Sequence, residues 1–114
     1  LLTTLKSGVF LVASMEEKIA GYISAIIENP AMASIASIAI HPSYRRKKIA
    51  KKLLVELMRV LREKNILNIK LEVRERNISA RSLYKTFGFK ELHTIKGYYE
   101  DGEDAIVMQL SLEK

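Results

Sequence analysis

The sequence predicts a mixed α/β domain in which two helices pack on a central sheet. Residues 67–73 alternate between apolar and polar side chains, which is the two-residue period of a strand. Residues 46–64 place apolar side chains three and four positions apart, which is the period of a helix with one buried face. A strand at residues 33–40 precedes this helix, so the three segments predict a right-handed β-α-β crossover.

An antiparallel hairpin is expected before this unit. Residues 9–13 and 19–27 are apolar runs of strand length, and a polar turn at residues 15–18 separates them. Gly21 marks a β-bulge in the second run, and the Asn-Pro pair at residues 29–30 ends it.

The strand at residues 33–40 is apolar on both faces, which is typical of a central strand covered by protein on both sides. The dipeptide His41-Pro42 ends it. After the crossover, Asn77 is a suitable N-cap for a second helix and Gly88 a suitable stop. Strands at residues 89–95 and 105–112 complete the order β-β-β-α-β-α-β-β, an α/β (α+β) mixed sheet with antiparallel outer strands.

Composition excludes several classes of site. The 114 residues suffice for one domain with a single core, and none of them is cysteine. Disulfides, thiolate metal sites and a cysteine nucleophile are therefore excluded, and a reducing cytoplasm is the expected location. We expect no metal site, because His41 and His93 lack ligand-like spacing. We also expect no membrane partner, because no apolar run approaches the roughly 20 residues that span a bilayer.

Positive charge is concentrated where the first helix begins. Residues 43–64 carry nine Lys or Arg and two Glu, so they contribute +7 to a net charge of +6. This distribution favours one focused anion site over a uniformly basic coat. Cations in a first helical turn oppose the macrodipole by roughly 0.3–1 kcal/mol each. The alternatives are a solvated basic face and a phosphate seat built from the backbone N–H groups of residues 46–51.

Three further positions have a structural and a functional interpretation. Glu72 lies on the polar side of its strand, as an ion-paired carboxylate or as a general base near a strand end. Tyr84 lies on the apolar face of the second helix, as a core residue or as a catalytic hydroxyl. The adjacent Tyr98 and Tyr99 are either surface aromatics or the wall of a substrate site.

Three motifs in sequence order carry a family resemblance. The first is Arg45-Arg46-Lys47-Lys48-Ile49-Ala50. The second consists of Leu71-Glu72-Val73-Arg74, Asn77, Ala80, Leu83-Tyr84 and Gly88-Phe89, and the third spans residues 98–108. Over residues 8–112 the sequence resembles the GNAT acetyltransferases, and more narrowly their ribosomal-protein and N-terminal α-amine acetyltransferases.

The resemblance implies direct acetyl transfer from acetyl-CoA in a ternary complex. It implies that backbone groups of Ile38, Ala39 and Ile40 hold the pantetheine arm and thioester. The expected pyrophosphate contacts are Arg45, Arg46, Lys47, Lys48, Ile49, Ala50 and Lys51. Asn77 and Tyr84 would lie near the thiol of the cofactor. Glu72 matches the general base and Tyr84 the general acid, and Tyr98 and Tyr99 would contact the substrate.

We therefore expect residues 1–114 to form one GNAT domain that acetylates the N-terminal α-amine of proteins or peptides, with association with the ribosome. A Lys side chain or a small-molecule amine is the alternative acceptor. The alternative of another class is a non-catalytic basic module that binds RNA or the ribosome. The near-neutral remainder of the chain and the lack of aromatic residues at positions 45–52 argue against that module and against a specific nucleic-acid partner.

Two departures from the family pattern carry expectations of their own. Lys48 stands where the cofactor motif has its first glycine. We expect a helical φ there, which needs no glycine, and an added contact from the Lys48 ammonium to phosphate. The family begins with a strand and two helices, so we expect an N-terminally incomplete domain in which residues 1–7 are the tail of the second of these helices.

Overall fold

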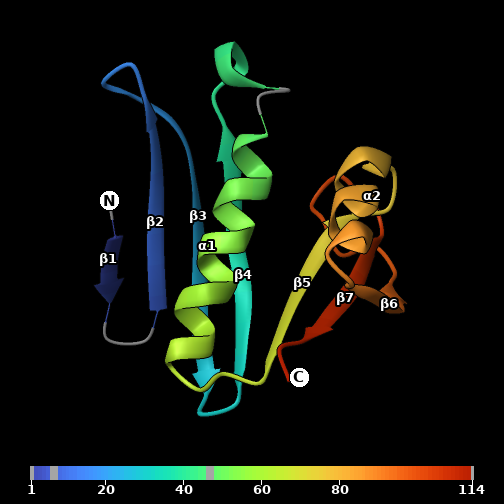
Figure 1. The fold of residues 1–114 in the computed structure, drawn as a ribbon. Helices are drawn as coiled ribbons and strands as arrows, with labels where there is room; N and C mark the ends of the chain where they lie inside the picture. Colours follow the sequence, from blue (N-terminus) through green and yellow to red (C-terminus); the bar gives the residue numbers. More distant parts are fainter. Residues whose placement is uncertain (1, 6–7, 46–47, 114) are drawn as a thin grey trace.

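The computed structural model describes residues 2–5, 8–45 and 48–113. Seven strands form one sheet in the order β1-β2-β3-β4-β5-β7-β6, and two α-helices pack on it (Figure 1). The strands are β1 (Leu2–Leu5), β2 (Gly8–Met15), β3 (Lys18–Asn29), β4 (Met32–Ile40), β5 (Asn68–Arg74), β6 (Lys90–Ile95) and β7 (Ala105–Ser111). The helices are α1 (Ile49–Glu63) and α2 (Ile78–Thr86), and a 3₁₀ turn at Pro42–Tyr44 precedes α1.

The pairing confirms the predicted mixed class. Strands β1 to β4 form an antiparallel meander, and β4 pairs in parallel with β5 across the α1 crossover. Strand β7 returns between β5 and β6, antiparallel to both. In the β2–β3 hairpin the register shifts between Ala13 and Ser14, opposite Gly21 and Ile19. The bulge predicted at Gly21 thus lies beside it, at Ala20.

Two predictions about helix limits are wrong. Residues 2–5 form β1, which pairs with β2, so they are not the tail of a helix; residues 1, 6 and 7 lie outside the described part of the chain. Helix α1 begins at Ile49 rather than at residue 46, because Pro42 opens a separate 3₁₀ turn and the chain then extends through Arg45.

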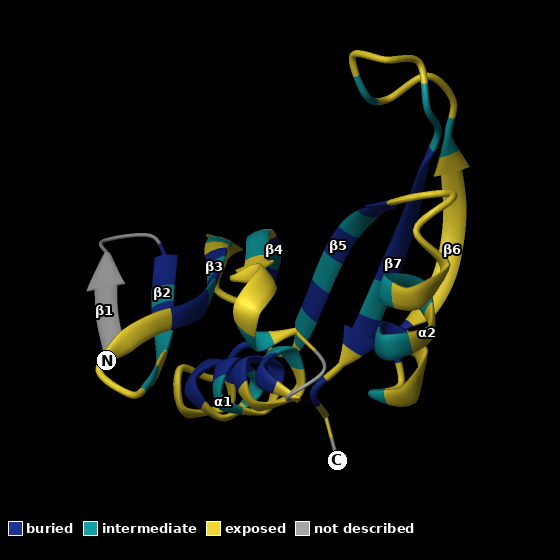
Figure 2. Cartoon of the chain, turned by 90° about the horizontal axis from the view of Figure 1, so that it is seen from above, coloured by how far each residue is buried: buried dark blue, intermediate teal, exposed yellow. Residues whose placement is uncertain are grey.

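The core lies between the helices and one face of the sheet. Helix α1 buries Leu54, Leu57 and Leu61 completely against β2, β3 and β4, as its apolar spacing predicts. Helix α2 contributes Tyr84, whose ring lies 5.6 Å from that of Phe89. Figure 2 shows both helices on the same side of the sheet.

We call the side of the sheet away from both helices the open face. It carries Phe10 stacked on Tyr22, and the Tyr22 hydroxyl lies 3.1 Å from the Ser37 hydroxyl. In β4, Ala36 and Ala39 are exposed, so the prediction of a strand covered on both sides is wrong. Neither described helix combines the length and apolarity needed to cross a membrane.

Candidate active site

The site begins where two parallel strands separate. The pairing of β4 with β5 covers Met32 to Ser34 against Asn68 to Lys70 and ends there. Beyond Ser34, the edge of β4 that faces β5 has no partner strand among the described residues. The backbone groups along this edge are therefore available to a ligand that lies between the two strands.

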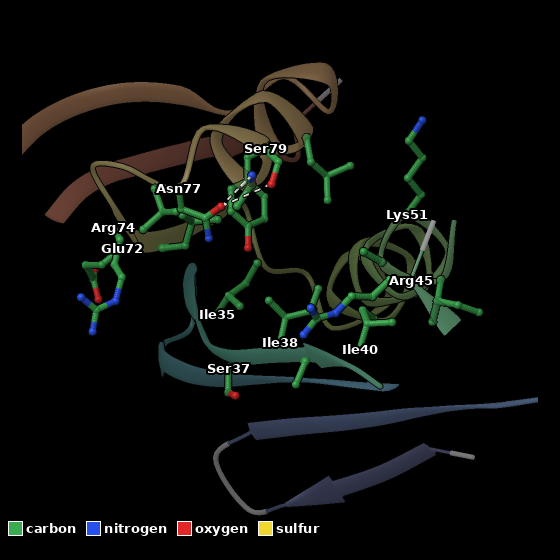
Figure 3. Close-up of a pocket in the computed structure, with 18 of the residues that line it drawn as sticks. Ile35, Ser37, Ile38, Ile40, Arg45, Lys51, Glu72, Arg74, Asn77 and Ser79 are labelled. Carbon is green, nitrogen blue, oxygen red and sulfur yellow. Dashed lines mark hydrogen bonds between the residues drawn. The ribbon is translucent and has the colours of Figure 1, made fainter. Parts of the chain in front are cut away.

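A β-bulge sets the direction of the β4 side chains at this point. In the register with β3, Ile35 faces Ala25 and Ser37 faces Ser24, so Ala36 is the extra residue. The bulge returns Ile38 and Ile40 to the helix-bearing face after Ile35. Figure 3 shows Ile35 and Ser37 on opposite sides of the strand.

A cavity of about 1000 Å³ fills the space between the separated strands and the starts of both helices. Its lining comprises Ile35, Ala36, Ser37, Ile38, Ala39, Ile40, Tyr44, Arg45, Lys48, Ile49, Ala50, Lys51, Leu71, Glu72, Val73, Arg74, Asn77, Ser79, Ala80, Leu83, Tyr84 and Tyr99. Consecutive residues of β5 line it, and their side chains alternate between the two faces of the sheet. Leu71 and Val73 therefore bound the cavity on the helix-bearing side, and Glu72 bounds it on the open face.

The N-terminus of α1 closes one end of this cavity. No side chain among the described residues caps it, and its first intrahelical bond runs from the Lys52 N–H to the Lys48 carbonyl. The N–H groups of Ile49, Ala50 and Lys51 therefore have no intrahelical acceptor, and all three residues line the cavity. These donors without an intrahelical acceptor, the positive end of the helix dipole and the nearby Arg45 form a suitable seat for a diphosphate.

Lys48 contradicts our expectation of a helical φ. Its backbone lies in the left-handed region, at φ 62° and ψ 22°, as the N-cap residue of α1. This region favours glycine, which explains why the cofactor motif has glycine at that position. Lys48 also lines the cavity.

The second helix starts at the opposite wall. Asn77 is its N-cap, as predicted, because its Oδ1 accepts a hydrogen bond of 3.2 Å from the Ala80 N–H. The Ser79 hydroxyl donates to the same oxygen at 3.4 Å. The oxygen of Asn77 is thus engaged within α2, whereas its amide NH₂ has no partner within the described part of the chain.

The position of Tyr84 is compatible with both interpretations that the sequence leaves open. It is a core residue with 6% of its surface exposed, and it also lines the cavity. Burial raises the pKa of the Tyr84 phenol, and the neighbouring Tyr99 adds to the shift. The phenol therefore stays protonated near neutral pH and can act as a proton donor.

Glu72 and the two loop tyrosines meet on the open face. The Tyr98 hydroxyl donates to Oε1 of Glu72 at 3.4 Å. The rings of Tyr98 and Tyr99 contact edge to face at 5.0 Å. Tyr99 lines the cavity, whereas Tyr98 does not line it and contacts Glu72, which does.

The structure brings most predicted site residues into one place. Those lining the cavity are Ile38, Ala39, Ile40, Arg45, Lys48, Ile49, Ala50, Lys51, Glu72, Asn77, Tyr84 and Tyr99. Arg46 and Lys47, predicted for the pyrophosphate, lie outside the described residues. Arg74 and Ser37 also line the cavity and were not among the predicted site residues. The sequence contains a signal for Arg74, because a cation at a strand end can form ion pairs with the acidic loop at residues 100–104.

The described residues include no cluster of His, Cys, Asp or Glu that could hold a metal ion. Around Glu72, the carboxylates of Asp101 and Glu103 instead pair with Arg74 at 2.8 and 2.9 Å. The Asp104 carboxylate accepts the Gly97 N–H, which lowers the pKa of Asp104.

Comparison with known proteins identifies the family. The model of the acetyltransferase (GNAT) family matches residues 2–89. An N-alpha-acetyltransferase of Saccharolobus solfataricus is 39% identical over 111 residues, which are 87% of this chain and 66% of that protein. The chain thus spans about two thirds of the length of this relative.

Solved structures agree in fold. The ribosomal-protein-S18-alanine N-acetyltransferase from Escherichia coli superposes with a TM-score of 0.89 at 29% identity, over 97% of this chain and 73% of that one. A GNAT family acetyltransferase from Elizabethkingia anophelis with acetyl-CoA bound has a TM-score of 0.86 at 17% identity, over 92% and 76% of the two chains, which shows likeness of fold alone. From the family match and the shared fold, this chain belongs to the GNAT acetyltransferase family, whose acyl donor is acetyl-CoA.

Proposed function

We propose that this domain transfers the acetyl group of acetyl-CoA to the N-terminal α-amine of proteins or peptides. The observation that carries the proposal is the cavity between β4 and β5, which has an uncapped helix N-terminus at one end and Glu72 at the other. Its volume of about 1000 Å³ and its lining suit a large ligand with an anionic diphosphate and an amide-rich arm. The relatives named above, an N-alpha-acetyltransferase and a ribosomal-protein-alanine N-acetyltransferase, support an α-amine as the acceptor.

The residues present fit the donor. The free N–H groups of Ile49, Ala50 and Lys51 would bind the diphosphate. The unpaired edge of β4 at Ile38 and Ile40 would hydrogen-bond the amides of the pantetheine arm, as an added strand would. When bound, acetyl-CoA supplies a thioester that is open to attack by an amine.

The acceptor chemistry needs a base and an acid on this chain. An α-amine has a pKa of about 8 and is mostly protonated at neutral pH, so it must lose a proton before it attacks. Glu72 would accept that proton, directly or through a water. The Tyr84 phenol, which its raised pKa keeps protonated, would donate a proton to the departing thiolate. The 114 residues contain no cysteine, so a cysteine acyl-enzyme is not available and direct transfer is proposed.

The test is a mass-shift assay of the 114-residue chain with acetyl-CoA and three kinds of peptide: a free N-terminus without Lys, a blocked N-terminus with an internal Lys, and a free N-terminus with an internal Lys. We expect +42 Da on free N-termini, the mass of an acetyl group less one hydrogen. Modification of the blocked peptides alone would favour the Lys-directed alternative. No modification of any peptide, with acetyl-CoA bound, would contradict the proposal.

Glu72→Gln separates catalysis from binding. We expect turnover to fall by roughly 10²–10⁴-fold, with the Kd for acetyl-CoA changed by less than about threefold. Glu75→Gln is the matched control, because Glu75 is an exposed carboxylate on the same segment that does not line the cavity. Equal turnover in wild type and Glu72→Gln would exclude Glu72 as the base.

A further inference from the structure

An arginine at the end of β5, Arg74, contacts the loop between β6 and β7 at the acceptor end of the cavity. Nη1 of Arg74 donates to Oδ2 of Asp101 at 2.8 Å and to Oε1 of Glu103 at 2.9 Å. Its guanidinium carbon lies 4.1 Å from the centre of the Tyr99 ring. These three partners all belong to the loop between β6 and β7, so a single side chain attaches that loop to β5.

The attachment continues to Glu72 through aromatic contacts. Tyr99, under the guanidinium, meets Tyr98 edge to face, and the Tyr98 hydroxyl donates to Glu72. Arg74 and Glu72 are two residues apart on β5 and therefore project from the same face. Arg74 thus stands at one end of a chain of contacts that finishes at the proposed base.

A second branch leads to α2. Oε1 of Glu103 accepts from Arg74, while its Oε2 accepts the Arg76 N–H at 2.9 Å. Arg76 lies directly before Asn77, the N-cap of α2. The Arg76 N–H and then Arg74 hold the pKa of Glu103 below its usual range, so this bridge is charged at neutral pH.

We infer that Arg74 is a positioning residue, which orients Tyr98 and Tyr99 against Glu72 and thereby forms the acceptor wall of the cavity. The inference rests on the proposed function, because it assigns that wall to the amine substrate. A solvated surface ion pair would be the plainer interpretation, and such pairs contribute little by themselves. Arg74 differs because two carboxylates and a ring face engage one planar group, an arrangement that lysine cannot reproduce.

Two measurements on the 114-residue chain test this role. Amide hydrogen exchange at Arg76 and Tyr99, whose N–H groups bond to Glu103, reports the loop attachment without any need for activity. Steady-state kinetics with a peptide acceptor at saturating acetyl-CoA measures the acceptor KM, which depends on the acceptor wall. Both are applied to Arg74→Gln, Arg74→Lys and the control Arg59→Gln. Arg59 is an exposed arginine that pairs with Glu56 and Glu63 on α1, away from this loop.

In Arg74→Gln we expect exchange at both amides to rise by about tenfold, and the acceptor KM to rise by about tenfold, while the Kd for acetyl-CoA stays within about twofold. Arg74→Lys should give intermediate values, because it retains a charge but not the planar contacts. Arg59→Gln should match the wild type in all three quantities.

Unchanged exchange in Arg74→Gln would overturn the inference, and so would an unchanged acceptor KM in a variant whose loop exchanges faster. An equal increase of the acceptor KM in Arg59→Gln would also overturn it, because the loss of one positive charge anywhere on the chain would then explain the effect. If the wild type acetylates no peptide, the proposed function fails. The exchange measurement then still decides whether Arg74 holds the loop.

Discussion

The backbone strain at Lys48 leads to a prediction with a calculable size. An L-residue in the left-handed helical region costs roughly 1–2 kcal/mol, which glycine avoids. Glycine also raises the entropy of the unfolded chain, at a cost of about 0.4–1 kcal/mol. We therefore expect Lys48→Gly to stabilise the domain by about 0.5–1 kcal/mol. For the 114 residues, this corresponds to a Tm increase of about 2–4 °C.

A second residue in the same conformation supplies the control. Glu17 lies in the β2–β3 turn at φ 65°, close to the φ of 62° at Lys48, and it does not line the cavity. Glu17→Gly should thus raise Tm by a similar amount. Differential scanning calorimetry of the wild type and both variants measures the effect.

The two variants should differ in cofactor binding. Lys48→Gly removes a cation beside the proposed diphosphate seat, so the Kd for acetyl-CoA should rise by roughly 1.5- to 5-fold, whereas Glu17→Gly should leave it unchanged. Lys48→Met should weaken binding by the same factor without the gain in Tm, because it keeps the strained φ and loses the charge. If Lys48→Gly lowers Tm while Glu17→Gly raises it, the strain argument at Lys48 is refuted.

Three other predictions use neighbouring groups. The pKa of Tyr84 is raised above 10.0 in the folded chain, so the unfolded chain loses this proton first as the pH rises. The stability of the wild type should therefore fall above pH 10. The Tm of Tyr84→Phe should fall less than that of the wild type between about pH 9 and 11. Asn77→Ala should cost about 0.5–2 kcal/mol through loss of the helix cap, whereas Asn77→Asp should keep the cap and weaken acetyl-CoA binding, as urea unfolding and calorimetric titration would show. Leu54→Ala should lower the free energy of unfolding by about 2–5 kcal/mol, because Leu54 is fully buried, and its exposed neighbour Val55 should tolerate the same change within about 0.5 kcal/mol.

Features that depend on short-range spacing were predicted correctly from the sequence. The three- and four-residue period placed α1 and its buried face, although the helix begins three residues later than expected. Asn77 could be predicted as an N-cap because asparagine is a preferred capping residue directly before a helix. In the structure its side-chain oxygen accepts the Ala80 N–H, three residues along the chain. Periodicity and capping act within one or two turns of chain, so the sequence displays them directly.

The prediction that β4 is covered on both faces was wrong, and the spacing of its isoleucines shows why. Ile35 and Ile38 are three residues apart, and an uninterrupted strand would place them on opposite faces. The bulge at Ala36 instead puts both on the helix-bearing face. The apolar run therefore reflects one buried face and a bulge, not two covered faces, and the same bulge forms the wall of the cavity.

The φ of Lys48 and the role of Arg74 could not be read from local spacing. Lysine has no preference for the left-handed region, so the residue itself gives no sign of that conformation, and the only signal was the glycine of the cofactor motif at this position. Arg74 and Glu103 are 29 positions apart, and the β5–β7 pairing brings their segments together. Contacts at such separations depend on topology, so the local sequence pattern does not reveal them.

The charges of the chain divide between the two ends of the cavity. Residues 45–52, at the donor end, carry six cations, whereas residues 72–76 and 96–104, at the acceptor end, carry three cations and six carboxylates. An anionic diphosphate and a protonated amine would thus each meet the opposite sign. A basic RNA-binding surface would not need the acidic end. This division of charge favours the proposed orientation of two ligands in one cavity over a uniformly basic RNA-binding surface.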